Sequence, residues 1–126
     1  MRVLILDDSR AMRAILRQMM QGLGFEVLEA ADGRAGLGCL QANGRADLAL
    51  VDWNMPEMDG LEFVHSVRAN HAYDKMRLMM VTTETEVTNV SEALTAGADE
   101  YVMKPFTKEV IRDKLELLGM LEESVQ

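Results

Sequence analysis

Carboxylate, hydroxyl and ammonium side chains follow directly after short apolar segments of this chain. Asp7 and Asp8 come after the first segment, Asp52 ends the third, Thr82 ends the fourth, and Lys104 comes after the fifth. The carboxyl ends of parallel strands meet at one edge of a sheet, and open α/β sheets bind their ligands there. If the apolar segments form such a sheet, these side chains converge on one rim.

Three carboxylates gathered at one edge repel one another unless a cation joins them. Oxygen ligands without cysteine or histidine favour a hard ion, and a few carboxylates with water and phosphate suit Mg²⁺ better than Ca²⁺. Asp7, Asp8 and Asp52 therefore predict a Mg²⁺ site. The alternative is that Asp7 and Asp8 only cap a helix, which leaves Asp52 without an explanation.

Lys104 and Thr82 would add a cation and a hydroxyl donor beside this metal, as phosphoryl-transfer sites require. With Mg²⁺ and Lys104 holding the oxygens of a phosphoryl group, an aspartate can attack phosphorus in line and become an aspartyl phosphate. We hypothesise this role for Asp52. It would explain why a carboxylate ends an otherwise buried strand.

Apolar runs alternate with segments of helical periodicity, which predicts an α/β fold with a mostly parallel sheet covered by helices on both faces. Residues 25–29 mix charges with apolar residues, as an edge strand does. Ser9 or Asp8 would cap the first helix, and Gly22 and Gly24 would end it. The expected strands are residues 3–6, 25–30, 48–51, 78–81 and 101–103. The first helix is marked by apolar residues from Met12 to Leu23, and further helices are expected over residues 33–42, 60–70, 87–96 and 107–121.

The composition fits one globular domain of 126 residues, 48% of them hydrophobic. A net charge of −8 argues against binding to nucleic acid or anionic membranes, which requires basic surface. Cys39 is the only cysteine, so no internal disulfide can form and a reducing compartment is expected. The apolar run before Asp7 is too short for a signal peptide or a membrane span, and we therefore expect a cytoplasmic protein.

The chain resembles a response-regulator receiver domain from end to end, and within that family it is most similar to the chemotaxis type. The resemblance implies a doubly wound five-stranded sheet in the order 2-1-3-4-5 with five helices. It also implies a single receiver domain over residues 1–126, without an output domain. The motifs that carry it are DDS at 7–9 with Met12 and Arg13, DWNMPEMDG at 52–60, VT at 81–82 and KPFT at 104–107.

The resemblance implies that Asp52 is the phosphoacceptor and assigns the ligands of a Mg²⁺ cofactor. The metal would be held by the carboxylates of Asp8 and Asp52 and by the backbone carbonyl of Asn54, while Asp7 would act through a water molecule. These assignments come from the family and are expectations for this chain.

The same resemblance implies that Thr82 hydrogen-bonds a phosphoryl oxygen, that Lys104 pairs with it, and that the Lys104-Pro105 peptide bond is cis. Tyr101 resembles the family's switch aromatic, whose ring turns inward when Thr82 moves toward the phosphate. The alternative for Tyr101 is an ordinary half-buried tyrosine of an edge strand.

Asn54 and Glu84 occupy the positions that tune phosphate hydrolysis in this family and match the chemotaxis pair, which predicts a short-lived phosphate. Two features depart from the chemotaxis pattern. Glu86 and Val87 stand where chemotaxis members often carry lysines, and Thr83 replaces the commoner alanine. The choice of partner and the phosphate lifetime stay open at this point.

The resemblance implies a monomeric signalling protein that takes its phosphoryl group from a histidine kinase and acts on a flagellar motor switch or another protein target. The alternative within the same chemistry is a phosphorelay shuttle or phosphate sink. A haloacid-dehalogenase-type phosphatase also uses an aspartate nucleophile, but it needs a second acid two residues later as general acid. Asn54 stands at that position, so we expect a phosphoacceptor and not an enzyme that turns over substrate.

Overall fold

The computed structural model describes residues 1–83 and 86–121. Within these ranges the strands are β1 (Arg2–Leu6), β2 (Glu26–Ala30), β3 (Leu48–Asp52), β4 (Arg77–Thr82) and β5 (Glu100–Met103). The α-helices are α1 (Arg10–Gly22), α2 (Gly33–Asn43), α3 (Gly60–Arg68), α4 (Val90–Ala96) and α5 (Lys108–Leu117). Two short 3₁₀ helices, η1 (His71–Tyr73) and η2 (Glu86–Asn89), complete the set.

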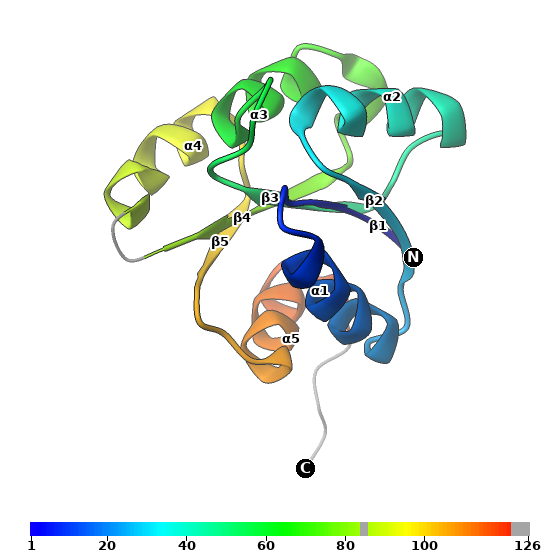
Figure 1. Cartoon of the computed structure of the whole chain (residues 1–126), viewed down its shortest axis with the longest axis vertical. Coiled ribbons are helices and arrows are strands. Elements are labelled where there is room, and N and C mark those ends of the chain that lie inside the picture. Colours follow the sequence, from blue (N-terminus) through cyan, green and yellow to red (C-terminus); the bar gives the residue numbers. More distant parts are fainter. Residues whose placement is uncertain (84–85, 122–126) are drawn as a thin grey trace.

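The strands pair in parallel in the order β2-β1-β3-β4-β5. Helices α2, α3 and α4 cover one face of the sheet, and α1 and α5 cover the other (Figure 1). The predicted doubly wound α/β fold and strand order are confirmed, and so is the edge position of residues 25–30. The strand order reverses between β1 and β3, which is where folds of this kind bind ligands.

The central strands are buried on both faces, as continuous apolar runs predict. Alternate residues of β1 serve opposite sides, so that Leu4 and Leu6 pack with α2, α3 and α4 while Val3 and Ile5 pack with α1 and α5. All five residues of β3 are buried, including Asp52 at its end. The carboxylate of Asp52 therefore extends from a strand that is packed on both faces.

Short polar side chains begin four of the five α-helices in the described ranges by accepting a backbone hydrogen bond from the first turn. Ser9, and not Asp8, caps α1, because its hydroxyl accepts from the Met12 amide at 3.2 Å. The carboxylate of Asp8 is therefore not used as a cap. The other three caps are Asp32 for α2, Asp59 for α3 and Thr107 for α5.

Two predicted helices differ from the structure at their ends. Residues 86–89 form the 3₁₀ helix η2 before α4 begins at Val90, so only part of the range 87–96 is α-helical. The last helix ends at Leu117 instead of residue 121. Gly119 there has a φ of +74°, and the Met120 amide donates to the Leu115 carbonyl at 2.9 Å, an arrangement that ends a helix.

No helix in the described part of the chain combines the length and the apolar character needed to cross a membrane.

Gly60 lets α3 approach the end of β3 closely, since a Cβ atom there would lie 2.6 Å from the carbonyl oxygen of Asp52. We expect Gly60→Ala to lower the free energy of unfolding by about 1–3 kcal/mol, because this backbone cannot move aside. The control is Gly38→Ala at an exposed position of α2, where no atom lies within 4 Å of the added Cβ. It should raise stability by about 0.5–1 kcal/mol. Urea denaturation measures both, and equal stabilities of the two variants would contradict the close approach.

Candidate functional site

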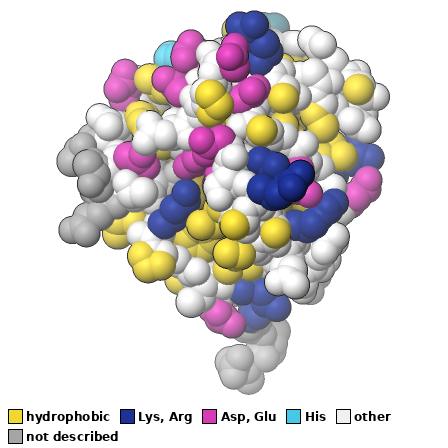
Figure 2. Space-filling model, in the orientation of Figure 1, with side chains coloured by type: hydrophobic (Ala, Val, Ile, Leu, Met, Phe, Trp, Pro, Cys, Tyr) yellow, Lys and Arg dark blue, Asp and Glu magenta, His cyan; other side chains and the backbone are white. Residues whose placement is uncertain are grey.

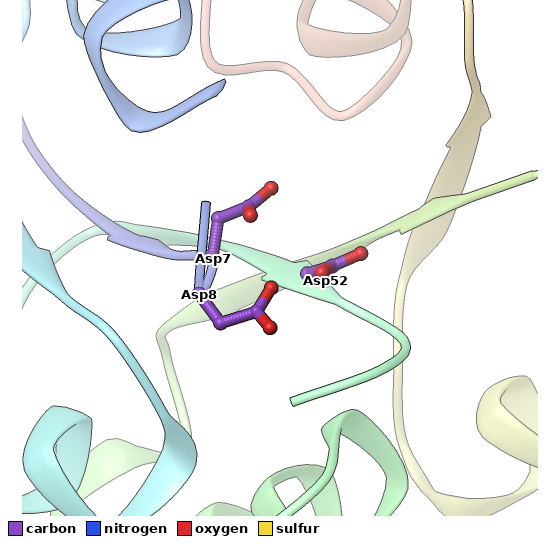
Figure 3. Close-up of side chains that lie close together, drawn as sticks. All are labelled: Asp7, Asp8 and Asp52. Carbon is purple, nitrogen blue, oxygen red and sulfur yellow. The ribbon is translucent and has the colours of Figure 1, made fainter. Parts of the chain in front are cut away.

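The three predicted carboxylates meet at the carboxyl end of the sheet. Asp7 and Asp8 follow β1, Asp52 ends the neighbouring strand β3, and one oxygen atom from each carboxylate lies within 4.8 Å of the others (Figure 3). Asp7 is 1% exposed and Asp52 is 7% exposed, whereas Asp8 faces solvent. Asp7 and Asp52 are therefore buried side by side, and Asp8 lies on the solvent side of the group.

Backbone hydrogen bonds hold Asp7 in place. One of its carboxylate oxygens, Oδ1, accepts from the Ser9 amide at 2.8 Å, and its own amide donates to the Ala30 carbonyl at 3.2 Å. The other oxygen, Oδ2, is buried and has no hydrogen-bond partner among the described residues. A buried acceptor without a donor is costly, so Oδ2 is available to a ligand that the site would hold.

Lys104 brings the only ammonium group that pairs with these acids within the described ranges. Its Nζ atom lies 3.5 Å from Asp52 Oδ1 and 3.7 Å from Asp7 Oδ2. Its amide donates to the Thr82 carbonyl at 2.7 Å, which ties the segment after β5 to the end of β4. The Lys104-Pro105 peptide bond is cis, as the family resemblance implies.

Thr82 ends β4 and is completely buried. Its hydroxyl oxygen, like Asp7 Oδ2, has no hydrogen-bond partner in the described part of the chain. A buried hydroxyl normally has a hydrogen-bond partner, so the Thr82 hydroxyl is available to donate a hydrogen bond to a bound ligand. The five residues predicted to converge on one rim thus come from the ends of the strands expected to supply them.

The donor set fits a Mg²⁺ ion. It consists of oxygen atoms only, it gathers like charges that repel, and it includes a buried carboxylate oxygen without a partner. Asn54, the other predicted ligand, lies in the loop after β3, two residues beyond Asp52.

Burial, followed by the charge of Asp7, raises the pKa of Asp52 from its ordinary value of 3.8 to about 6, although Lys104 acts in the opposite direction. The negative charge of Glu86 adds to the increase. A carboxylate that is costly to ionise gains stability from a nearby divalent cation or from losing its charge. The raised pKa of Asp52 and the grouping of the carboxylates therefore both favour a bound cation.

Glu86 lies beside the site, although the sequence indicated it only as a departure from the family pattern. Its carboxylate accepts hydrogen bonds from the side-chain amide of Asn54 and, at 3.0 Å, from the backbone amide of Thr83. The Glu86 amide in turn donates to the Thr83 hydroxyl at 3.4 Å. The spacing Thr83-x-x-Glu86 is a capping box, a sequence signal that could have placed this carboxylate. Glu84, the predicted partner of Asn54 in hydrolysis, lies outside the described residues.

Tyr101 lies on the edge strand β5, and its half-buried ring packs against the core beneath α2, α3 and α4. The Lys114 ammonium lies 4.9 Å from the centre of the ring and 3.2 Å from Glu100 Oε1. An inward or an outward ring would both be compatible with an edge strand. The switch role of Tyr101 therefore stays a prediction.

An apolar groove lies beside the carboxylates, with a volume of about 440 Å³. Lys104 lines it on the side of the site, and Ile15 is 47% exposed along α1. Figure 2 shows hydrophobic side chains gathered over α1 on this face of the molecule. The other lining residues are Met12, Met19, Pro105 and Phe106.

Comparison with known proteins identifies the class to which this fold and site belong. A family model described as the response regulator receiver domain matches residues 3–116. The chain therefore belongs to the receiver-domain family of response regulators.

Its relatives include chemotaxis proteins. The chain is 42% identical over 119 residues to chemotaxis protein CheY1 of Helicobacter pylori, covering 94% of this chain and 96% of the relative. It is 44% identical over 117 residues to the chemotaxis protein CheY homolog of Campylobacter jejuni, covering 92% and 90%. Among solved structures, the chemotaxis response regulator CheY4 of Vibrio cholerae superposes with a TM-score of 0.85 at 38% identity, covering 93% of this chain and 97% of that one.

The raised pKa of Asp52 makes stability depend on pH. The native state holds the Asp52 proton up to about pH 6 while the unfolded chain loses it near 3.8, so the free energy of unfolding should fall as the pH rises between these values. Asp52→Asn removes this cost and should stabilise the metal-free protein by about 1–3 kcal/mol at pH 7. The gain should vanish below about pH 4. Denaturation at several pH values in EDTA measures it.

Asp113→Asn is the control for that measurement, because it removes one carboxylate from an exposed position of α5. It should change stability little at any pH. If Asp52→Asn gave the same gain at pH 3.5 as at pH 7, the effect would not come from the ionised carboxylate.

Proposed function

We propose that this receiver domain accepts a phosphoryl group on Asp52 from a histidine kinase in a Mg²⁺-dependent reaction and thereby changes the surface that it offers to a partner. The observation that carries the proposal is the grouping of Asp7, Asp8 and Asp52 around a buried, unpartnered oxygen, with the Lys104 ammonium between 3.5 and 3.7 Å from two of them. Nucleophile, cation and metal ligands are thus present at one rim.

The chemical step is a displacement at phosphorus. An Asp52 oxygen supplies the electron pair for the new O–P bond, while the P–N bond to the donor imidazole breaks and its electron pair goes to nitrogen. Lys104 pairs with the charge on the phosphoryl oxygens. Asp8, Asp52 and the Asn54 backbone carbonyl would hold Mg²⁺, with Asp7 acting through water. The bound ion would neutralise charge on the acids and on the phosphoryl group.

The response to phosphorylation would begin at Thr82, whose hydroxyl has no partner in the described structure. A hydrogen bond to a phosphoryl oxygen would give it one and draw the residue toward the rim. Tyr101 would then turn inward and remodel the face made by α4, β5 and α5. Such a change needs only a few kcal/mol of differential contact, since the phosphate biases a two-state equilibrium.

A histidine kinase is proposed as the phosphodonor, and the apolar groove beside Lys104 supports a protein donor. A partner seated over Ile15 would bring its phosphohistidine to the neighbouring acids without meeting further negative charge in the groove lining. The named chemotaxis relatives favour a flagellar motor switch as the target. A phosphorelay shuttle or phosphate sink is the alternative, and we propose a monomeric, cytoplasmic protein in either case.

Hydrolysis of the phosphate would be tuned at Asn54. The side chain of Asn54 is held by Glu86, while its family partner Glu84 lies outside the described residues. Asn54 cannot act as a general acid. We therefore expect the chain to be modified stoichiometrically and not to act as a catalyst of phosphate-ester hydrolysis.

Trp53 adjoins Asp52 and is half-buried, so its fluorescence should report on the site. We expect a change when Mg²⁺ is added and a further change with acetyl phosphate. Asp8→Asn removes a proposed ligand and should raise the Mg²⁺ Kd by about tenfold or more. Asp52→Asn should abolish the acetyl phosphate response. Asp32→Asn, which alters only the cap of α2, is the control and should keep both responses. Wild-type Trp53 fluorescence that does not change when Mg²⁺ is added would contradict the metal site.

Incubation with p-nitrophenyl phosphate and Mg²⁺ separates the phosphoacceptor from a haloacid-dehalogenase-type phosphatase. We expect p-nitrophenolate release no faster than the aspartyl phosphate itself hydrolyses, because Asn54 cannot act as the general acid and base that a phosphatase uses to turn over its intermediate. Absorbance at the p-nitrophenolate band follows the release. Turnover much faster than the loss of phosphate from the isolated phosphorylated protein, and abolished by Asp52→Asn, would instead assign an enzymatic activity.

A further inference from the structure

Arg13 reaches from α1 to the backbone of the acidic pair. Its Nη1 atom donates a hydrogen bond of 2.6 Å to the carbonyl oxygen of Asp7, and its side chain is only 18% exposed. Neither the metal ligands nor the proposed phosphoryl contacts include this arginine. Its contact is with the main chain between Asp7, which would act on the ion through water, and Asp8, which would hold it directly.

The Asp7 carbonyl belongs to the peptide unit that joins Asp7 to Asp8. Because that unit is planar, a donor that fixes the carbonyl also fixes the direction in which the Asp8 backbone leaves. Asp8 is exposed, and no hydrogen bond within the described part of the chain reaches its carboxylate. The orientation of the Asp8 side chain toward Asp52 therefore depends on the backbone from which it extends.

Glu29 of β2 holds the arginine in place. Its Oε1 atom lies 3.5 Å from Arg13 Nε, and its Oε2 atom lies 3.0 Å from Arg17 Nη1. One carboxylate thus pairs with two guanidinium groups that stand one helical turn apart on α1. Only Arg13 continues from this cluster to the rim, whereas Arg17 has no contact with Asp7 among the hydrogen bonds of the described residues.

We propose that Arg13 is a positioning residue for the metal site, which fixes the Asp7-Asp8 peptide so that both carboxylates face Asp52. The assignment rests on the proposed function, since it concerns the same carboxylates and the ion they would hold. The distal anchor is Glu29, so the edge strand β2 takes part in ordering a site to which it contributes no ligand. Losing a partner that orients metal ligands commonly lowers metal affinity by about 10–100-fold.

The test compares Arg13→Gln with Arg17→Gln, which removes the same charge and the same kind of pair with Glu29. Mg²⁺ titrations followed by Trp53 fluorescence and by calorimetry give the Kd, and thermal unfolding in EDTA gives the stability. We expect Arg13→Gln to raise the Mg²⁺ Kd about tenfold or more. Arg17→Gln should stay within about twofold of wild type. Both variants should unfold at similar temperatures in EDTA. Arg13→Lys, which keeps a donor, should recover part of the affinity.

Equal Mg²⁺ affinities of Arg13→Gln and Arg17→Gln, in a wild-type protein that binds the ion, would overturn the role of Arg13 and leave the proposed function intact. A larger Kd for Arg13→Gln accompanied by a matching loss of stability would also overturn it, because the effect would then be on folding. A wild-type protein without any Mg²⁺ response would overturn the proposed function and this role together.

Discussion

The cost of ionising carboxylates that are buried side by side is the constraint on which the rest of this structure depends. Asp7 and Asp52 are buried at the ends of adjacent parallel strands, and burial, followed by the charge of Asp7, raises the pKa of Asp52 to about 6. Lys104 relieves that cost only in part, since it stands 3.5 Å or more from either acid. The fold thus keeps a local excess of negative charge that a bound cation or a neutralised carboxylate would reduce.

The rest of the molecule serves to keep these charges where they are. Strand β3 is buried along its whole length and packs on both faces against helices. The Ser9 amide and the Ala30 carbonyl fix Asp7, while Gly60 lets α3 close on the Asp52 backbone. A site with unfavourable electrostatics persists because packing elsewhere determines its geometry.

Much of this arrangement could be predicted from the sequence because it follows from short-range rules. Apolar runs that end in Asp7, Asp52 and Thr82 identify buried strands, and parallel strands necessarily bring their ends together. The choice between Ser9 and Asp8 as helix cap could not be made, since both are good caps and adjacent. Only the hydrogen bond to Met12 decides it.

Contacts between distant segments could not be predicted from these short-range rules. The pairing of Asn54 with Glu86 joins two loops, and the hydrogen bond from Arg13 to Asp7 depends on how α1 is rotated over the sheet. Gly119 carried a local signal for the end of α5, but the apolar spacing of the following residues concealed it. Side-chain direction across elements is set by packing, which no pattern along one segment contains.

Glu86 is the first residue of η2, and its carboxylate accepts hydrogen bonds from two loops, through Asn54 after β3 and Thr83 after β4. The polypeptide after β3 and the polypeptide after β4 consequently share one anchor and have fewer independent ways to rearrange than two separate loops. The end of the phosphoacceptor strand β3 is thereby connected to η2, the segment that leads into α4, by side-chain hydrogen bonds that lie outside the interior of the sheet.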